Sequence, residues 1–285
     1  MHAPGILALL LAQAVTTAPA PPPVAFHLTP QGAIIVPVTL EGSDPVAFMI
    51  DTGSNASLMS EALASALGAQ PIARTTMASA AGQKEALVTR IGHLTLGGIA
   101  AADVLMTVVP DIAINVPDAA ADGLSVKGVI GQDVLGGFRY TIDYRERRIV
   151  WHDAGAKPPR RAAMFELEPR DDRFLVVLPQ DRDVLRLVPD SGADTLVLFQ
   201  REGDPRSDMT PGADFFQLTG VTGTRGARRA VVHALRIGTT TLKDVSAVIV
   251  GREAASPAAD GLLPLHIFAR VTFNGPERQL LIENR

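Results

Sequence analysis

The sequence predicts an all-β protein built from two related lobes. From residue 24 onward, short runs rich in Val, Ile, Leu and Thr alternate with clusters of Gly, Pro and Asp, which is the pattern of strands separated by turns. A series of landmarks also occurs twice in the same order, which indicates a duplicated unit. At 285 residues, the chain is long enough to bury a core in each of two lobes.

The regular elements follow from local patterns. Residues 33–40, 104–109 and 246–250 are apolar, β-branched runs and are predicted strands. One helix is predicted over residues 60–67, because Ser60 and Glu61 favour a start and Gly68 favours a stop.

Each half opens on an Asp, a hydroxyl residue and a Gly that follow an apolar run. The triplets are Asp51-Thr52-Gly53, after residues 46–50, and Asp190-Ser191-Gly192, after residues 185–189. One such triplet is a weak signal, but two in the same context suggest that the fold brings two carboxylates together.

Four further landmarks repeat behind these triplets. They are Gly-rich polar segments, apolar-Gly pairs followed by an Asp, apolar-apolar elements ending in Gly or Pro, and closing strand–turn–strand units. In the first half they cover residues 79–83, 96–103, 128–131 and 138–147, and in the second half 219–224, 237–244, 261–264 and 268–278.

The domain organisation follows from composition. Residues 153–163 contain Gly155, Pro158-Pro159 and Arg160-Arg161 and are predicted to be a linker between lobes at residues 25–152 and 164–285. Residues 5–11 form a short apolar stretch that precedes Ala12-Gln13-Ala14, so residues 1–14 are predicted to be a signal peptide, although Lys and Arg are missing ahead of that stretch. Residues 15–24 then form a Pro-rich spacer. We expect an exported protein, periplasmic or extracellular.

Composition excludes several classes of function. The net charge of −4, without a basic stripe, argues against nucleic-acid binding. The absence of Cys removes disulfides, thiolate metal sites and Cys nucleophiles, and the His residues lack the spacing of metal ligands. The apolar N-terminal stretch is too short to span a bilayer, so no stable membrane insertion is expected after signal cleavage.

The duplicated pattern resembles the aspartic peptidases of the pepsin/retropepsin-like superfamily, in a bacterial-type exported two-lobe form. The resemblance covers about residues 30–152 and 165–283. It implies an aspartic-protease-like fold, with two antiparallel β-barrel-like lobes and a cleft between them. It also implies an endopeptidase that acts on peptide or protein substrates without a cofactor, and a monomer, because one chain contains both Asp loops.

The resemblance assigns roles residue by residue. Asp51 and Asp190 would form the catalytic dyad. The supporting residues of the active-site loops would be Thr52, Gly53, Ser191, Gly192 and Gly131, and the flap residues over the substrate would be Ala81, Gly82, Val221, Thr222 and Gly223.

Two carboxyl groups in contact cannot both ionise cheaply, so they share one proton, as is established for aspartic proteases. The ionised partner would act as general base on a water molecule, and the protonated partner would polarise the scissile carbonyl.

Departures from the family pattern lead to an alternative. Pro264 stands where the second apolar-apolar element is expected to have Gly, and Pro189 precedes Asp190. Pro lacks an N–H and fixes φ, so the second loop has a different backbone support. The alternative is a peptide-binding protein that retains the fold but is catalytically impaired.

Other readings have less support. A glycosidase also needs two carboxylates, but its sugar platform is usually aromatic-rich, and the chain has one Trp and two Tyr. The G-x-S-x-G motif of serine hydrolases is missing, and the Gly-rich stretch at residues 220–226 lacks the Lys of a phosphate loop. Arg160-Arg161 and Arg228-Arg229 are predicted to be solvated charge, with a processing or anionic-partner role as the alternative.

Overall fold

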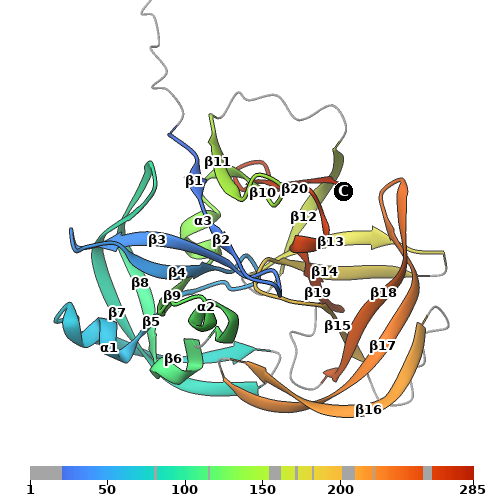
Figure 1. The fold of residues 1–285 in the computed structure, drawn as a ribbon, viewed down its shortest axis with the longest axis horizontal. Coiled ribbons are helices and arrows are strands. Elements are labelled where there is room, and N and C mark those ends of the chain that lie inside the picture. The colour runs from blue at the N-terminus through green and yellow to red at the C-terminus, as the bar shows by residue number, and fades with distance from the viewer. Residues whose placement is uncertain are drawn as a thin grey trace, which may run out of the picture.

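The computed structural model describes residues 21–79, 82–114, 116–153, 162–170, 173–181, 183–200, 209–220, 222–252 and 259–285. Two lobes of strands lie side by side, with a sheet shared by both at one end (Figure 1). The prediction of an all-β, bilobal protein is confirmed. The predicted signal peptide, the first part of the spacer (residues 15–20) and most of the linker (residues 154–161) lie outside the described residues.

The N-terminal lobe is a closed barrel. Its strands follow the order β2-β3-β4-β9-β5-β8-β7-β6, and β3 also pairs with β7, which closes a ring. The strands are β2 (His27–Leu28), β3 (Ile34–Leu40), β4 (Val46–Ile50), β5 (Ser57–Ser60), β6 (Pro71–Ser79), β7 (Gly82–Leu96), β8 (Ile99–Val109) and β9 (Val126–Ile130).

The C-terminal lobe repeats this order as β13-β14-β19-β15-β18-β17-β16. Where β3 pairs with β7 in the first lobe, the side-chain amide of Gln180 bridges to the backbone of Arg236 through bonds of 3.1 and 2.9 Å. The strands are β13 (Arg173–Pro179), β14 (Val184–Asp190), β15 (Leu196–Gln200), β16 (Met209–Gly220), β17 (Gly223–Ile237), β18 (Thr240–Gly251) and β19 (Gly261–Pro264).

Backbone conformation supports the duplication independently of strand order. Asp103 and Asp244 adopt left-handed φ angles of 55° and 49° at the same point of equivalent hairpins. Gly97 and Gly238 turn those hairpins with φ angles of 59° and 60°. Such angles are uncommon outside Gly, Asn and Asp, so their recurrence marks a repeated local structure.

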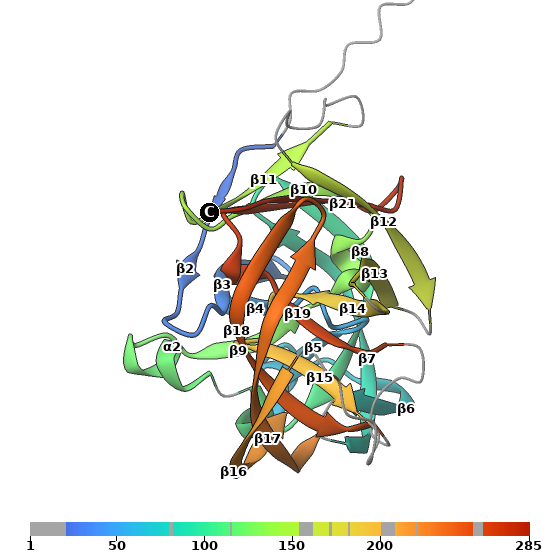
Figure 2. The same ribbon diagram turned by 90° about the vertical axis from the view of Figure 1, so that its right-hand side faces the viewer.

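The shared sheet was not predicted as a unit. The closing strand–turn–strand of each half forms as expected, but the two pair with each other, in the order β1-β11-β10-β20-β21-β12. Figure 2 shows this sheet at the end of the molecule opposite to the hairpin β16–β17. The strands are β1 (Val24–Ala25), β10 (Arg139–Asp143), β11 (Arg148–His152), β12 (Ala163–Arg170), β20 (Arg270–Asn274) and β21 (Gln279–Glu283).

The pseudo-twofold axis that relates the two lobes passes through this sheet. Thr141 and Thr272 occupy equivalent places in the two halves, pair in register, and join through their hydroxyl groups at 2.6 Å. Beside them, Tyr140 stacks on Phe273 with ring centroids 5.1 Å apart, and both rings are buried. The lobes are therefore held together by packed apolar surface as well as by hydrogen bonds.

Helices are few and short. The predicted helix forms as α1 (Glu61–Ala66), with the Ser60 hydroxyl accepting from the Leu63 N–H as an N-cap. Among the described residues, the sequence analysis did not predict the helices α2 (Pro117–Ala121) and α3 (Gln132–Leu135) or the 3₁₀ turns η1 (Asp111–Ile114) and η3 (Leu265–Ile267). Among the helices of the described residues, none has the length and apolar character that a membrane span requires.

The packing of the shared sheet leads to a stability prediction. Because Phe273 is 3% exposed and stacks on Tyr140, we expect Phe273→Ala to lower the free energy of unfolding by about 3–5 kcal/mol. Phe273→Leu is the control and should cost less, because it leaves a smaller cavity. Urea denaturation measures both, and equal losses would contradict the packing argument.

Candidate active site

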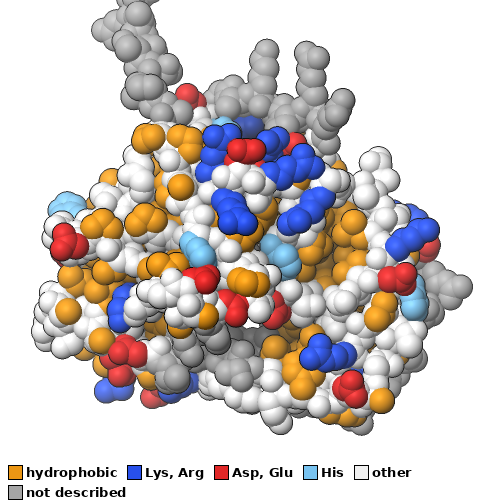
Figure 3. Space-filling model, viewed as in Figure 1, with side chains coloured by type: hydrophobic (Ala, Val, Ile, Leu, Met, Phe, Trp, Pro, Cys, Tyr) orange, Lys and Arg blue, Asp and Glu red, His pale blue; other side chains and the backbone are white. Residues whose placement is uncertain are grey.

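The two Asp loops meet where the lobes face each other. Asp51 follows β4, Asp190 ends β14, and their carboxyl groups are hydrogen-bonded to each other. The residues that the resemblance named as a dyad are therefore brought together. In the space-filling view, acidic side chains lie near the middle of the face, between the lobes (Figure 3).

Each carboxyl group is held by its own loop in the same way. One oxygen of Asp51 accepts from the N–H groups of Gly53 and Ser54 at 2.9 and 3.1 Å. The equivalent oxygen of Asp190 accepts from the N–H groups of Gly192 and Ala193 at 2.7 and 3.0 Å. These bonds restrict the side-chain rotamers of both Asp residues.

Thr52 and Ser191 lock the loops together beneath the carboxyl groups. The backbone N–H of Thr52 donates to the Ser191 hydroxyl at 3.1 Å, and the N–H of Ser191 donates to the Thr52 hydroxyl at 3.0 Å. Each hydroxyl then donates across the junction at 2.8 Å, to the carbonyl oxygens of Pro189 and Ile50. These four bonds cross between the lobes and are buried, so they form a rigid base for the dyad.

Gly53 and Gly192 are required by the approach of the opposite loop. A Cβ on Gly53 would lie 2.5 Å from the Asp190 carboxyl carbon, and a Cβ on Gly192 would lie 2.9 Å from that of Asp51. Any side chain here would push the carboxyl groups apart. The conformational freedom of Gly is secondary at these two positions, since neither has a positive φ.

Burial and mutual repulsion set the protonation of the pair. Burial raises the pKa of Asp190 well above its ordinary value, and the Asp51 carboxylate raises it further. Burial also raises the pKa of Asp51, but the hydrogen bond from Asp190 and the loop N–H groups oppose that rise. Asp190 is 7% exposed and Asp51 is more accessible, so the pKa of Asp190 is raised further and the pair shares a proton.

The N-terminal loop has a polar support that sequence analysis missed in part. Gly131 was predicted to pack behind the loop, and its N–H donates to the Ser57 hydroxyl at 3.1 Å. The Ser57 hydroxyl in turn donates to Asp133 at 2.8 Å, and the Ser57 N–H donates to the other oxygen of that carboxylate at 3.0 Å. A signal for Asp133 was present, since it lies two residues beyond the apolar-apolar-Gly element.

The C-terminal loop replaces this support with apolar packing. Pro264 pairs in register with Asp190, at the place of Gly131, and the buried Leu196 stands six residues after its Asp, as Ser57 does. The N–H donor and the hydroxyl acceptor are thus lost together, and such a paired loss is nearly neutral. Pro264 and Leu196 therefore leave neither half of that one hydrogen bond unpaired behind Asp190.

The two long hairpins that overhang the site are β6–β7, termed the first flap, and β16–β17, termed the second flap. Gly82 and Gly223 occupy matching places at their turns, opposite Ser79 and Gly220, and β7 contacts β17. Thr222 is part-buried in the turn of the second flap. Ala81 and Val221, also predicted as flap residues, lie outside the described residues.

Apolar clusters flank the dyad in both lobes. In the first lobe, Val129, Leu58 and Val109 are buried, and Met49 of β4 and Met77 of the first flap pack on them. The second lobe has a corresponding cluster, which contains Val188, Val197 and Val248. A chain lying across the dyad would meet apolar surface on either side.

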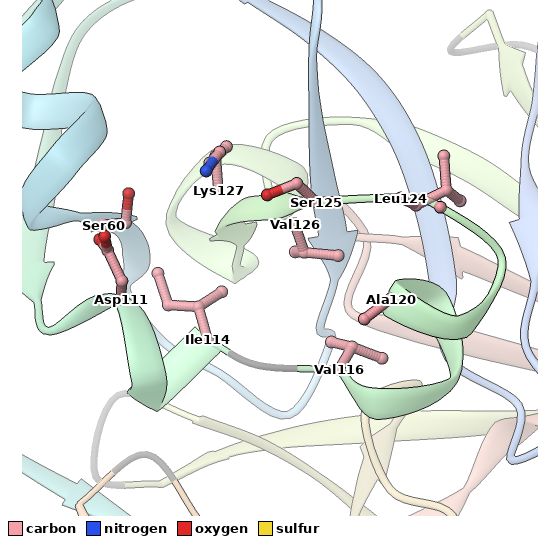
Figure 4. A pocket seen from close by; sticks show the side chains of 10 residues that line it. Ser60, Asp111, Ile114, Val116, Ala120, Leu124, Ser125, Val126 and Lys127 are labelled. Atoms are coloured by element: carbon pink, nitrogen blue, oxygen red, sulfur yellow. The ribbon is translucent and has the colours of Figure 1, made fainter.

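A separate cavity of about 510 Å³ opens in the N-terminal lobe between η1, α2 and β9 (Figure 4). Ser60 and Asp111 line one side, Ala120 and Leu124 line the other, and Lys127 lies at the start of β9 (Figure 4). None of its lining residues belongs to either Asp loop. Within the described ranges, no group of three or more His, Asp or Glu side chains is placed to hold a metal ion.

Comparison with known families agrees with the assignment of the first Asp loop. A family model described as aspartyl protease matches residues 36–134, which include Asp51, both strands of the first flap, and Gly131. No curated protein matches the chain. The resemblance to the aspartic peptidases is thus confirmed, by sequence within the N-terminal lobe.

One solved structure shows the same fold over nearly the whole chain, and two others are similar at lower scores. Basic 7S globulin from soybean matches with a TM-score of 0.52 and 12% identity, over 93% of this chain and 95% of that one. Conglutin gamma, a basic 7S globulin from lupine seeds, matches with a TM-score of 0.48 and 11% identity over 93% and 95%. A retropepsin-like aspartic protease from Rickettsia conorii matches with a TM-score of 0.34 and 17% identity, over 45% of this chain and 89% of that one. The likeness to the soybean structure, together with the strand order repeated in the two lobes, confirms the two-lobe aspartic-protease-like fold.

The crossed hydroxyl network leads to a prediction about coupling. Thr52→Val and Ser191→Ala each remove one hydroxyl from it, and each should cost about 1–3 kcal/mol of stability because partners are left buried and unpaired. Since the two residues bond each other, the double variant should lose less than the sum, by about 0.5–3 kcal/mol. Urea denaturation of the four proteins measures this difference, and strict additivity would show that the loops are not coupled.

The raised pKa of Asp190 leads to a pH prediction. Above the ordinary pKa of 3.8, the folded protein keeps a proton that the unfolded chain has lost, so the stability of the wild type falls as the pH rises toward the folded pKa. Asp190→Asn removes this titration. The melting temperature of the variant, relative to that of the wild type, should therefore increase as the pH rises from acidic to neutral. Asp103→Asn, at a carboxylate that is 72% exposed, is the control and should show no such trend. A gain for Asp190→Asn that is independent of pH would contradict this protonation.

Proposed function

We propose that this chain, a relative of the retropepsin-like aspartic peptidases, is an endopeptidase that hydrolyses peptide bonds with a water molecule activated by Asp51 and Asp190. The observation that carries the proposal is the matched pair of carboxyl groups, in hydrogen-bonding contact and held by equivalent loops. Burying two acids against each other is costly, and a structural role would not require it.

The two carboxyl groups have different tasks in this proposal. Asp51, the more accessible and ionised partner, accepts a proton from a bound water as that water attacks the scissile carbonyl carbon. Asp190 holds the shared proton and donates a hydrogen bond to the carbonyl oxygen as negative charge develops there. The proton taken by Asp51 then passes to the leaving amine, which restores the starting state without a covalent intermediate or a cofactor.

The substrate in this proposal is an extended segment of a peptide or protein. It lies between the dyad and the two flaps, with apolar side chains against the clusters of the two lobes. Closure of the flaps would exclude bulk water and orient the peptide bond. Both Asp loops belong to one chain, so a monomer suffices.

Export is part of the proposal and rests on the N-terminal sequence alone. Residues 1–14 would direct the chain to the periplasm or the extracellular space, and the mature protein would begin after Ala14. Sequencing the N-terminus of protein secreted from its native cells checks this.

The alternative is a peptide-binding protein that retains the fold but lacks turnover. It is favoured by the likeness in fold to soybean basic 7S globulin, whose description names no peptidase activity. Fold alone therefore does not decide between catalysis and binding. The loop of Asp190 argues against the alternative, because two of its N–H groups still donate to the Asp190 carboxyl group despite Pro189 and Pro264.

Cleavage of a diverse peptide library, read by mass spectrometry from acidic to neutral pH, tests the proposal. We expect wild-type cleavage with a pH profile set by the pair, and a loss of at least about 100-fold in both Asp51→Asn and Asp190→Asn. Asp103→Asn is the matched control and should cleave as the wild type does. A folded wild type that binds peptides and cleaves none would instead favour the alternative.

A further inference from the structure

We propose that Arg229, on the second flap, selects a substrate with an acidic side chain on the C-terminal-lobe side of the scissile bond. The inference rests on the proposed function, since it names the chemistry of one substrate position. It starts from an asymmetry between the two flaps.

The apolar cluster of the C-terminal lobe lies on the same face as the dyad. Val188 precedes Asp190 by two residues on β14, and side chains two apart on a strand share a face. Val188 belongs to the cluster, and Phe216 and Leu218 of the second flap pack on it. The second flap therefore turns one of its faces toward the site.

Arg229 lies on that face. Ala227 pairs with Phe216 across the flap and belongs to the same cluster, and Arg229 is two residues farther along β17. Arg229 also pairs with Val248, another member of the cluster. Strand alternation therefore places the guanidinium group on the side of the flap that faces the substrate.

Phe216 holds the guanidinium group in place. The Arg229 Cζ lies over the Phe216 ring at 5.1 Å from its centroid, and the side chain is exposed. Stacking of this kind orients the cation and leaves its edge N–H donors free to bind a carboxylate. Within the part of the chain that the structure describes, no ion pair joins Arg229 to an Asp or Glu.

The first flap has no cation at the place that Arg229 occupies in the second. Thr75 pairs with Ala86 as Phe216 pairs with Ala227, so Thr75 stands at the place of Phe216. Val88 pairs with Thr107 of β8, as Arg229 pairs with Val248 of β18, and stands at the place of Arg229. Arg225 is a second cation on the site-facing side of the second flap. It corresponds to Lys84 of the first flap, so it does not distinguish the two lobes. The asymmetry therefore lies in the Phe216–Arg229 pair.

Arg228 provides a matched control on the opposite face of the same strand. Its Cζ lies over the Phe215 ring at 5.8 Å, and that ring is 77% exposed. Arg228 pairs with Ile249, which packs in the main core rather than in the cluster beside the dyad. Loss of either Arg removes one charge and one stacked pair, but only Arg229 faces the substrate.

The test uses peptide pairs that differ only by Glu or Gln, placed at each position around a cleaved bond. We expect the wild type to prefer Glu by about three- to tenfold in kcat/KM at a position on one side of that bond only. The preference should disappear in Arg229→Gln, turn into discrimination against Glu in Arg229→Glu, and persist in Arg228→Gln. It should also fade below the pKa of a free Glu, about 4.3, where the ligand loses its charge.

The outcomes separate the inference from the proposed function. A wild type that cleaves peptides with no preference for Glu, or equal losses in Arg229→Gln and Arg228→Gln, would overturn the role of Arg229 and leave the endopeptidase intact. If the wild type cleaves nothing, binding of Glu-rich and Gln-rich peptide pools is compared by fluorescence anisotropy. A Glu preference that depends on Arg229 would then support the inference while the proposed function fails. Equal binding would reject both.

Discussion

The structure depends on holding two acidic side chains in contact inside a protein. Burial raises the pKa of each, and if both ionised, their repulsion would separate loops that were free to move. The crossed bonds between Thr52 and Ser191 remove that freedom, because each residue both donates to and accepts from the other loop. The glycines complete the arrangement, since no side chain would fit between the loops.

Duplication of the lobe is what brings the two carboxyl groups together. A pseudo-twofold relation places equivalent atoms face to face, so one loop design, used twice, brings two carboxyl groups together. The shared sheet fixes the same relation at the other end of the molecule, where the equivalent residues Thr141 and Thr272 meet. Small shifts between the lobes would disturb both ends at once, so the shared sheet and the dyad loops constrain each other.

Local patterns predicted the Asp loops, the helix α1 and the repeated hairpins, because each depends on residues close together in sequence. The six-stranded shared sheet was not predicted, since pairing β10 with β20 joins residues that are more than a hundred positions apart. The support by Ser57 and Asp133 was missed because these two residues are 76 positions apart and meet only in the folded lobe. The proline at position 264 was correctly identified as a departure, but its compensation by Leu196 became visible only when the strands were placed in register.

Symmetry is kept where two equal groups must meet and is lost where the substrate lies. The dyad loops, their N–H donors and their glycines match almost atom for atom between the lobes. The supports behind them already differ, with polar bonds in one lobe and apolar packing in the other, because only the position of each carboxyl group matters. The flaps differ further, because the second flap has Phe216 and Arg229 at the positions where the first flap has Thr75 and Val88. A peptide has a direction, so a site that recognises one register of a peptide requires unlike surfaces on its two sides, and the stacked Arg229 supplies such a difference.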